Sequence, residues 1–268
     1  MELGLTGRRA IVTGGSKGLG KAIAAELLAE GAAVAICSRH AGELEETAAE
    51  LRTAAGAGTA GDGRQLLALP CDVTDPAQVA DFVAAVAADL GGLDILVNNA
   101  GGARPGRFAT LTDEDWHEDI EVKLFSQIRC IRAALPHLRA SAAPRVININ
   151  ALYARYPDPA FLASSVNRAS CLSLSKALSI ELGTEGILVN SVNIGFVETP
   201  QWQNIHHRRA PEMPADEFFG QLAKAEVPLG RFGRSEEVAG LVAFLASDRA
   251  SYIAGASIDV GGGMGKSL

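Results

Sequence analysis

Short apolar runs alternate with longer amphipathic stretches along most of the chain. Apolar runs bounded by glycine and other turn residues are typical of strands buried on both faces of a parallel sheet. Amphipathic stretches that end at glycine are typical of helices. The pattern predicts strands at residues 10–12, 33–37, 66–69, 95–97, 145–149, 187–192 and 257–260, and helices at residues 21–30, 43–52, 76–90, 113–140, 161–183 and 235–246.

This alternation predicts an α/β fold, a doubly wound parallel sheet with helices on both faces. Neither a repeat nor a low-complexity linker divides the chain, so we expect residues 1–268 to form a single domain. Residues 53–65 are rich in Gly, Ala and Thr and are predicted to be a flexible connection. Residues 199–233 interrupt the pattern, and we interpret them as a lid over a site.

The composition narrows the class of protein. Of the 268 residues, 48% are hydrophobic and 21% are charged, and the formal net charge is −7. This acidic balance does not favour nucleic-acid binding. The chain has neither a long apolar run nor a signal peptide, so we expect a cytoplasmic protein that does not cross a membrane. The four cysteines are far apart and form no Cys-x-x-Cys pair, which indicates reduced thiols and no metal site.

A glycine-rich turn follows the first predicted strand and leads into the first predicted helix. Glycines let backbone N–H groups approach a phosphate, and a helix N-terminus favours negative charge. Residues 15–21 also fit the spacing of a P-loop, but Ala22 stands where a P-loop needs Ser or Thr for magnesium. We therefore predict that the turn binds a dinucleotide through Gly14, Ser16, Lys17, Gly18, Leu19 and Gly20.

The end of the second predicted strand indicates which dinucleotide binds. An acidic residue there would accept hydrogen bonds from the adenosine ribose and repel a 2′-phosphate. The chain has Ser38 and Arg39 instead. Arg39 and Lys17 are suited to a 2′-phosphate, as a guanidinium fork and a point charge respectively. We therefore expect NADP(H) to be favoured over NAD(H); alternatively, Arg39 is a solvated surface residue.

Further motifs extend this pattern along almost the whole chain, namely Cys71-Asp72-Val73, Asn98-Asn99-Ala100-Gly101, Gly195-Phe196-Val197-Glu198-Thr199 and the stretch 228–233. In these motifs the sequence resembles the short-chain dehydrogenase/reductase family. The resemblance implies a Rossmann-like domain with a seven-stranded parallel sheet. It also implies a homo-oligomer, a dimer or tetramer, paired through residues 113–140 and 161–183. The implied cofactor contacts are Asp72 and Val73 for adenine, Asn99, Ala100 and Gly101 for support, and Val197 and Thr199 for nicotinamide.

The catalytic positions of that family are all changed in this chain. The family uses a Ser, a Tyr, a Lys and an Asn, and the matching positions hold Ala151, Ser164, Arg168 and Lys123. Ser164 is too short to replace a phenol. Arg168 keeps a charge that can hold ribose hydroxyls, but a guanidinium is a poor proton shuttle. The usual transfer of a proton to the substrate oxygen is therefore in doubt.

Two tyrosines and a Ser–Arg pair are candidates to replace the lost chemistry. Tyr153 lies two residues after the family's Ser position and could deliver a proton from another direction, and Tyr156 is a second candidate. Alternatively, each phenol packs on its loop and hydrogen-bonds the backbone. Ser164 and Arg168 could orient a substrate oxygen without ionising, or could be helix residues with no chemistry.

Lys123 is the remaining candidate. If Lys123 and Arg168 converge, as their counterparts in the family do, two cations would suit a carboxylate, phenolate or enolate and would lower the pKa of the lysine. Such a lysine could act as an acid or base. Alternatively, Lys123 leaves the site and pairs with Glu121 or Asp119. The basic residues 206–209 could contact an anionic substrate or form a solvated face.

Together these features predict an atypical NADP(H)-dependent oxidoreductase of the short-chain type. It would transfer hydride to or from a small carbonyl-type or tautomerisable cyclic substrate, which could be anionic or phenolic. Two other classes stay open. One is an enzyme without net redox change, such as a cyclase, isomerase or lyase. The other is a non-catalytic, nucleotide-bound partner subunit.

Overall fold

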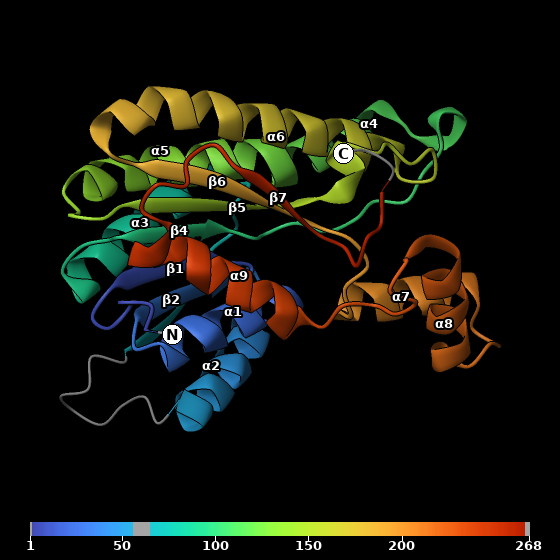
Figure 1. The fold of residues 1–268 in the computed structure, drawn as a ribbon, viewed down its shortest axis with the longest axis horizontal. Coiled ribbons are helices and arrows are strands. Elements are labelled where there is room, and N and C mark those ends of the chain that lie inside the picture. The colour runs from blue at the N-terminus through green and yellow to red at the C-terminus, as the bar shows by residue number, and fades with distance from the viewer. Residues whose placement is uncertain (1, 56–64, 266–268) are drawn as a thin grey trace.

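A seven-stranded sheet runs through the centre of the molecule (Figure 1). The computed structural model describes residues 2–55 and 65–265. The strands lie in the order β3-β2-β1-β4-β5-β6-β7, and every neighbouring pair is parallel. The predicted single α/β domain with a doubly wound sheet is confirmed. The strands are β1 (Arg9–Thr13), β2 (Ala33–Ser38), β3 (Leu66–Pro70), β4 (Ile95–Asn98), β5 (Arg145–Ala151), β6 (Leu188–Ile194) and β7 (Ser257–Val260).

Helices cover both faces of the sheet (Figure 1). Because side chains alternate along a strand, Val12 and Ile36 pack toward α1, α2 and α9, whereas Ile11 and Ala35 pack toward α3 and α5. Within residues 2–55 and 65–265, no helix combines the length and the apolar character that crossing a bilayer requires. The helices are α1 (Gly18–Ala29), α2 (Ala41–Ala55), α3 (Pro76–Leu90), α4 (Asp113–Ile120), α5 (Ser126–Arg139), α6 (Leu162–Glu181), α7 (Pro200–Arg209), α8 (Ala215–Glu226) and α9 (Ser235–Ala246).

Local signals account for both ends of α3. The carboxylate of Asp75 accepts hydrogen bonds from the first N–H groups of α3, and Gly91 ends that helix in the left-handed conformation. The helix predicted at 21–30 begins earlier, at Gly18, because the glycine turn itself provides its first turn. The flexible connection predicted at 53–65 is wrong for residues 53–55, where α2 continues. Residues 56–64 lie outside the described part of the chain.

The segment 199–233 contains two helices, α7 and α8, which project beyond the edge of the sheet (Figure 1). An aromatic cluster attaches these helices to the rest of the molecule. We use that name for Phe161, Phe196, Trp202, Phe218 and Phe232, all of which are buried. Trp202 packs edge-on against Phe196, with ring centroids 4.7 Å apart. The cluster therefore seats the segment on the core, and its role as a lid remains a prediction.

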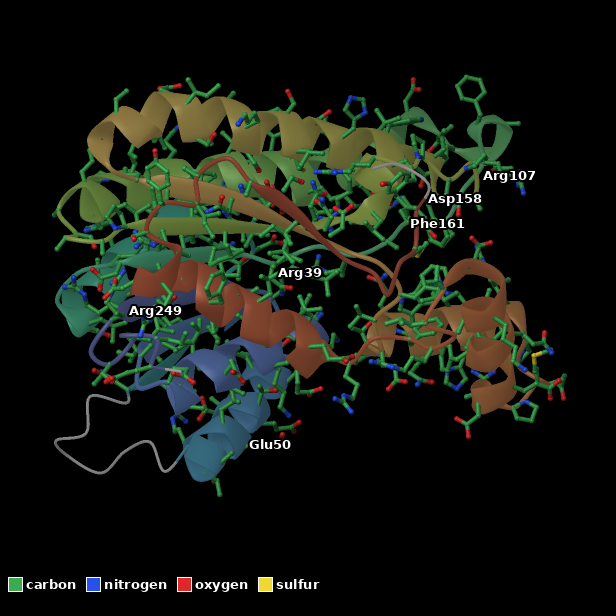
Figure 2. The ribbon with its side chains drawn as sticks, viewed as in Figure 1. Arg39, Glu50, Arg107, Asp158, Phe161 and Arg249 are labelled. Atoms are coloured by element: carbon green, nitrogen blue, oxygen red, sulfur yellow. The ribbon has the colours of Figure 1, made fainter. Side chains whose placement is uncertain are left out.

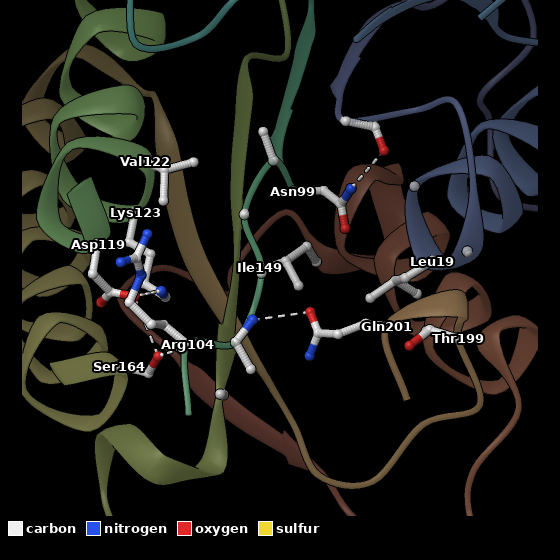
Figure 3. A pocket seen from close by; sticks show the side chains of 18 of the residues that line it. Leu19, Asn99, Arg104, Asp119, Val122, Lys123, Ile149, Ser164, Thr199 and Gln201 are labelled. Atoms are coloured by element: carbon white, nitrogen blue, oxygen red, sulfur yellow. Dashed lines mark hydrogen bonds and ion pairs between the residues drawn. The ribbon is translucent and has the colours of Figure 1, made fainter. Parts of the chain in front are cut away.

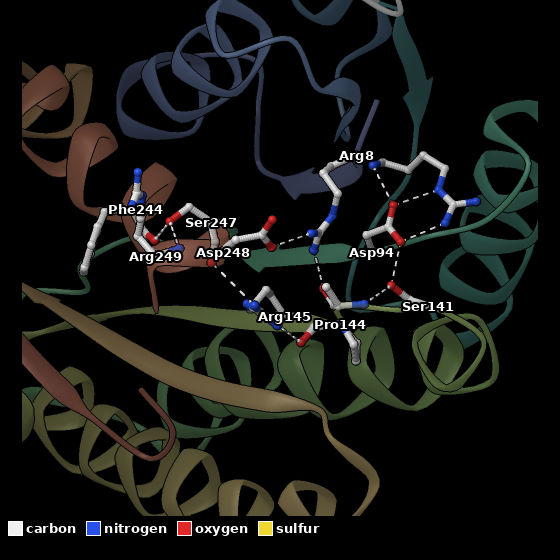
Figure 4. A network of polar contacts seen from close by, with 11 residues as sticks. Arg8, Asp94, Ser141, Pro144, Arg145, Phe244, Ser247, Asp248 and Arg249 are labelled. Carbon is white, nitrogen blue, oxygen red and sulfur yellow. Dashed lines mark hydrogen bonds and ion pairs between the residues drawn. The ribbon is translucent and has the colours of Figure 1, made fainter. Parts of the chain in front are cut away.

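A polar network joins the amino ends of the central strands (Figure 4). The carboxylate of Asp94 accepts hydrogen bonds from the backbone N–H of Arg9 at 2.9 Å and from its guanidinium at 2.8 and 2.7 Å. Ser141 donates to the same carboxylate at 2.5 Å. Arg8 reaches both Asp248 and the carbonyl oxygen of Ala143. The network ties β1 to β4 and to the segment before β5, on the edge opposite the glycine turn.

Candidate active site

A cavity of about 1040 Å³ lies at the carboxyl ends of the strands. In doubly wound sheets, ligands bind at this edge, where the strand order reverses between β1 and β4. Except for Tyr156, the second tyrosine candidate, every residue predicted for the cofactor or for proton transfer lines this cavity. These residues are Gly14, Ser16, Lys17, Gly18, Leu19, Gly20, Ser38, Arg39, Asp72, Val73, Asn99, Ala100, Gly101, Lys123, Tyr153, Ser164, Arg168, Val197 and Thr199.

The glycine turn leaves room and free donors for a phosphate. A Cβ on Gly20 would lie 2.1 Å from the carbonyl oxygen of Gly14, so the turn folds directly onto the start of α1. Gly14 has a φ of +66°, which favours glycine. No side chain caps the first N–H groups of α1, because the residue before it is Lys17. Backbone N–H groups at an uncapped helix start can hold a pyrophosphate, so the turn fits a dinucleotide.

Asn99 supports the turn from the neighbouring strand β4. Its amide donates to the carbonyl oxygens of Thr13 at 2.9 Å and of Gly14 at 3.1 Å (Figure 3). The hydroxyl of Thr13 in turn accepts from the backbone N–H groups of Asn99 and Ala100, each at 3.0 Å. These contacts fix the spacing between the ends of β1 and β4, the place where the predicted dinucleotide would lie.

The adenosine end of the cavity carries exposed positive charge. Arg39 is exposed at the cavity edge and lies near the middle of the view in Figure 2. The Lys17 ammonium lies 2.9 Å from Glu43, so its charge is partly neutralised. Because exposed ion pairs of this kind are weak, Lys17 can exchange Glu43 for a phosphate at little cost.

Lys123 lies in a π-helical turn, η2 (Glu121–Phe125), between α4 and α5. A π-helical turn inserts one extra residue, which rotates the side chains around it, and such turns are frequent at functional sites. The side chain of Lys123 is 1% exposed, and its ammonium forms an ion pair with Asp119, which is equally buried. Lys123 therefore pairs with Asp119, as one alternative expected, but it does not leave the site, because it still lines the cavity.

The electrostatic surroundings of Lys123 include a second cation, as predicted. Burial is the largest effect on its pKa, and the Arg168 guanidinium adds to it, while Asp119 opposes both. The result is a pKa lowered to about 8. A lysine with this pKa is protonated near neutral pH and gives up its proton more readily than a surface lysine.

Arg168 is anchored at the end of β5 and directed into the cavity. Its guanidinium donates to the carbonyl oxygen of Ile149 at 2.7 Å, and the Asn150 amide donates to the carbonyl oxygen of Arg168 at 3.0 Å. A Cβ on Gly101 would lie 3.2 Å from the guanidinium, so Gly101 leaves space for it. Burial lowers the pKa of Arg168. The guanidinium is thus a fixed group, suited to holding hydroxyls or an oxyanion.

Asp119 accepts contacts from three side chains, and two of these residues, Lys123 and Ser164, are labelled beside it in Figure 3. Besides the Lys123 ammonium, the Ser164 hydroxyl donates to it at 3.3 Å and the Asn167 amide at 2.8 Å. The Ser164 oxygen accepts from the backbone N–H of Arg104 at 3.1 Å. Sequence reasoning weighed Asp119 as a partner of Lys123, from the spacing of four residues, but did not find Asn167.

Comparisons with known proteins show which family the chain belongs to. The profile of a family described as enoyl-(acyl carrier protein) reductase matches residues 14–265. The 3-oxoacyl-(acyl-carrier-protein) reductase of Salmonella typhimurium is 35% identical over 96% of this chain and 97% of that protein. The chain belongs to the short-chain dehydrogenase/reductase family.

Two solved structures of this family share both fold and sequence with the chain. L-sorbose reductase from Gluconobacter frateurii, complexed with NADPH and L-sorbose, has a TM-score of 0.94 at 31% identity and covers 100% of both chains. A short chain oxidoreductase from Pseudomonas aeruginosa, bound to NADPH and described as containing an atypical catalytic center, has a TM-score of 0.91 at 38% identity. That match covers 99% of this chain and 100% of the other.

The two tyrosine candidates differ in their position relative to the cavity. Tyr153 lines the cavity and stacks on Phe161, with ring centroids 5.2 Å apart. Burial, together with the carboxylate of Asp158, raises the pKa of the Tyr153 phenol well above its usual value. A phenol shifted in this direction is a weaker acid than an ordinary tyrosine. Tyr156 does not line the cavity.

The outer end of the cavity is bounded by α7 and the aromatic cluster. Phe196 and Trp202 line it, and Gln201 accepts a hydrogen bond from the backbone N–H of Ala103 at 2.9 Å (Figure 3). Of the basic residues 206–209, Arg208 lines the cavity, whereas the Arg209 guanidinium lies over the Phe161 ring, 5.4 Å from its centre. His206 is buried against Phe218. The basic run is therefore divided between cavity, surface and core.

Proposed function

We propose that the protein is an NADPH-dependent carbonyl reductase in which Lys123, in place of the family's tyrosine, donates the proton. The observation that carries the proposal is a buried ammonium that lines the cavity and has a pKa lowered to about 8. General acids act best when their pKa lies near the working pH. The reaction would turn a ketone into an alcohol.

The cofactor preference rests on the adenosine end of the cavity. The exposed guanidinium of Arg39 and the lack of an acidic side chain at positions 38 and 39 favour a 2′-phosphate. The glycine turn would hold the pyrophosphate through backbone N–H groups, and Arg168 would hold the nicotinamide ribose hydroxyls. The bound dinucleotide would supply the hydride. Two family members with similar folds, described above, are NADPH-bound, which supports the same preference.

Three other groups that line the cavity are less suited to donate the proton. The Ser164 hydroxyl directs its proton to Asp119. Arg168 holds its protons too tightly, and burial makes the Tyr153 phenol a weaker acid. The Lys123 ammonium has three N–H donors, so it can reach a substrate oxygen while Asp119 accepts one of them. As the carbonyl carbon gains hydride, the oxygen takes a proton from Nζ, and Lys123 becomes a neutral amine.

The substrate class follows from the two ends of the cavity. The inner end holds two cations, Lys123 and Arg168, against one buried carboxylate, Asp119. The outer end has the apolar rings of Phe196 and Trp202. A small cyclic or β-dicarbonyl compound whose oxygen carries partial or full negative charge would be stabilised by this arrangement.

The test is NADPH oxidation at 340 nm with three probes: ethyl acetoacetate, 1,3-cyclohexanedione and 9,10-phenanthrenequinone. We expect turnover of at least one, and a fall in kcat of about 100-fold or more in Lys123→Met with the affinity for NADPH unchanged. Lys224→Met, on the surface of α8, is the matched control. Product formation without a change in absorbance would indicate a non-redox enzyme instead. Full activity in Lys123→Met would exclude the lysine as the donor.

A further inference from the structure

We propose that Asp119 is a positioning residue that holds the Lys123 ammonium at the base of the cavity and sets how readily it releases its proton. Ser164 and Asn167 hold Asp119 in place for this task. Nothing in the family resemblance assigns a role to Asp119 or Asn167. The catalytic part of this inference rests on the proposed function of Lys123.

The contacts around Asp119 leave its carboxylate no freedom. One oxygen receives the Lys123 ammonium and the Ser164 hydroxyl, and the other receives the Asn167 amide at 2.8 Å. Asp119 lies on α4, Lys123 on the π-helical turn η2, and the two other partners on α6. All four side chains are buried. A carboxylate that is tied to two helices in this way keeps a fixed distance to the ammonium.

The hydrogen bonds from Lys123, Ser164 and Asn167 are all donated to the Asp119 carboxylate. The backbone N–H of Arg104 donates to the Ser164 oxygen, so the single hydroxyl proton is free to point toward Asp119. The Asn167 group at the other oxygen is an amide donor. Donors to a carboxylate favour its charged form. Asp119 therefore receives donors on both of its oxygens, and the Lys123 ammonium is held against one of them.

The charged and titratable groups around Lys123 lie on α4, on α6 and in the π-helical turn itself. Asp119 on α4 raises its pKa, Arg168 on α6 lowers it, and Cys171 on α6 raises it slightly as the last of the causes. Glu121, in the same π-helical turn, is paired with Arg129 at 2.7 Å. Asp119 and Arg168 thus act in opposite directions on one buried ammonium. Removing the negative charge of Asp119 should therefore lower the pKa of Lys123, and removing the positive charge of Arg168 should raise it.

Two variants test this opposition with a readout independent of turnover. The protein is labelled with ¹³Cε-lysine, and the Lys123 signal is identified by its loss in Lys123→Met. We expect Asp119→Asn to move its titration midpoint down by about one pH unit or more, and Arg168→Gln to move it up. Asp89→Asn, an exposed carboxylate on α3, is the control and should leave the midpoint in place. An unmoved midpoint in Asp119→Asn would overturn the proposal.

A rate measurement separates this inference from the proposed function. In Asp119→Asn, the basic limb of kcat/KM for ketone reduction should move down together with the midpoint. If the midpoint moves and the limb does not, Lys123 is not the proton donor and the catalytic role of Asp119 falls with it. Should Asp119→Asn not fold, Asn167→Ala keeps the charge but frees the carboxylate. It should lower kcat and leave the KM for NADPH unchanged; unaltered kcat would contradict the positioning role.

Discussion

A lysine that is 1% exposed keeps its ammonium only because a carboxylate lies beside it. Burial and Arg168 lower the pKa of Lys123 from 10.5 to about 8, a shift that Asp119 limits. On a protein surface the same side chain would hold its proton throughout the neutral range. The surroundings, not the residue type, therefore make Lys123 a candidate acid.

The charge on Lys123 predicts a pH dependence with a defined sign. Under the proposed function the protonated form is the donor in ketone reduction, so kcat/KM should be level below about pH 7 and fall about tenfold per unit above about pH 8. In alcohol oxidation the neutral amine is the base, so the rate should rise through the same range. Initial rates from pH 6 to 10 in both directions check this. A reduction profile that stays level to pH 10 would contradict it.

The position of Arg39 leads us to predict a preference for NADPH over NADH. Its exposed guanidinium is free to form a charge-assisted contact with a 2′-phosphate, which NADH lacks. We expect Arg39→Ala to raise the Kd for NADPH by about 10- to 100-fold and to leave that for NADH almost unchanged. Arg52→Ala, an exposed arginine on α2, is the control. Equal weakening of both coenzymes would show that Arg39 does not read the phosphate.

At the level of helices and strands, the junction between β1 and α1 is packed too closely to admit a side chain at position 20. A Cβ on Gly20 would collide with the Gly14 carbonyl and approach the Asn99 amide to 2.5 Å. The Gly14 carbonyl belongs to the turn that would hold the pyrophosphate, and the Asn99 amide supports that turn from the end of β4. β1 and α1 can therefore pack in this way only with glycine at position 20. The predicted phosphate site depends on this packing.

Gly20→Ala is accordingly expected to cost about 2 kcal/mol in the free energy of unfolding and to weaken NADPH binding. The comparison is Gly240→Ala, in the interior of α9 with open space around it, which should stabilise the protein by about 0.5–1 kcal/mol. Urea unfolding and NADPH fluorescence titration measure the two effects. If both alanines behave alike, the collision at Gly20 is relieved by movement and has no role in binding.

The helices also show where sequence patterns are sufficient to predict where a helix begins and ends. α3 carries its start and stop signals within its own residues, and its predicted range, 76–90, matches the structure. The helix predicted at 113–140 instead divides into α4, the π-helical turn and α5. Periodicity could not reveal that turn, because the extra residue is stabilised by packing against α6 and by the buried Lys123–Asp119 pair.

In the molecule as a whole, the groups proposed for chemistry and the network that stabilises the fold lie at opposite edges of the sheet. The cavity lies at the carboxyl edge, while the Asp94 network lies at the amino edge (Figure 4). Burial raises the pKa of Asp94, but the hydrogen bonds from Arg9 and Ser141 outweigh it, and the pKa is lowered overall. The ionised carboxylate therefore stabilises the fold at neutral pH.

Asp94→Asn should lower the free energy of unfolding at pH 7 by about 2–3 kcal/mol. Because the folded pKa lies below the unfolded value of about 4, this contribution is complete above pH 5 and is lost as the pH falls toward the folded pKa. The difference between variant and wild type should therefore shrink in acid. The KM for NADPH should not change. A constant difference from pH 3 to 7 would show that the charge of Asp94 is not responsible.

Sequence alone determined the parallel sheet, the order of its elements along the chain and the set of residues predicted to hold a dinucleotide. These features depend on local signals: apolar runs, helix caps, and glycines at fixed positions in one turn. The same locality explains why all the predicted cofactor residues line one cavity, since parallel strands bring their carboxyl ends to a single edge.

Only the tertiary structure decided what the side chains at the changed catalytic positions contact. Ser164 and Asn167 meet Asp119 across 45 and 48 residues of chain, and no pattern within either segment encodes that contact. The same burial that weakens the Tyr153 phenol as an acid strengthens the Lys123 ammonium as one, because desolvation disfavours whichever form is charged. Burial is a property of the packed molecule, so the choice between these two groups could not be made from residue types.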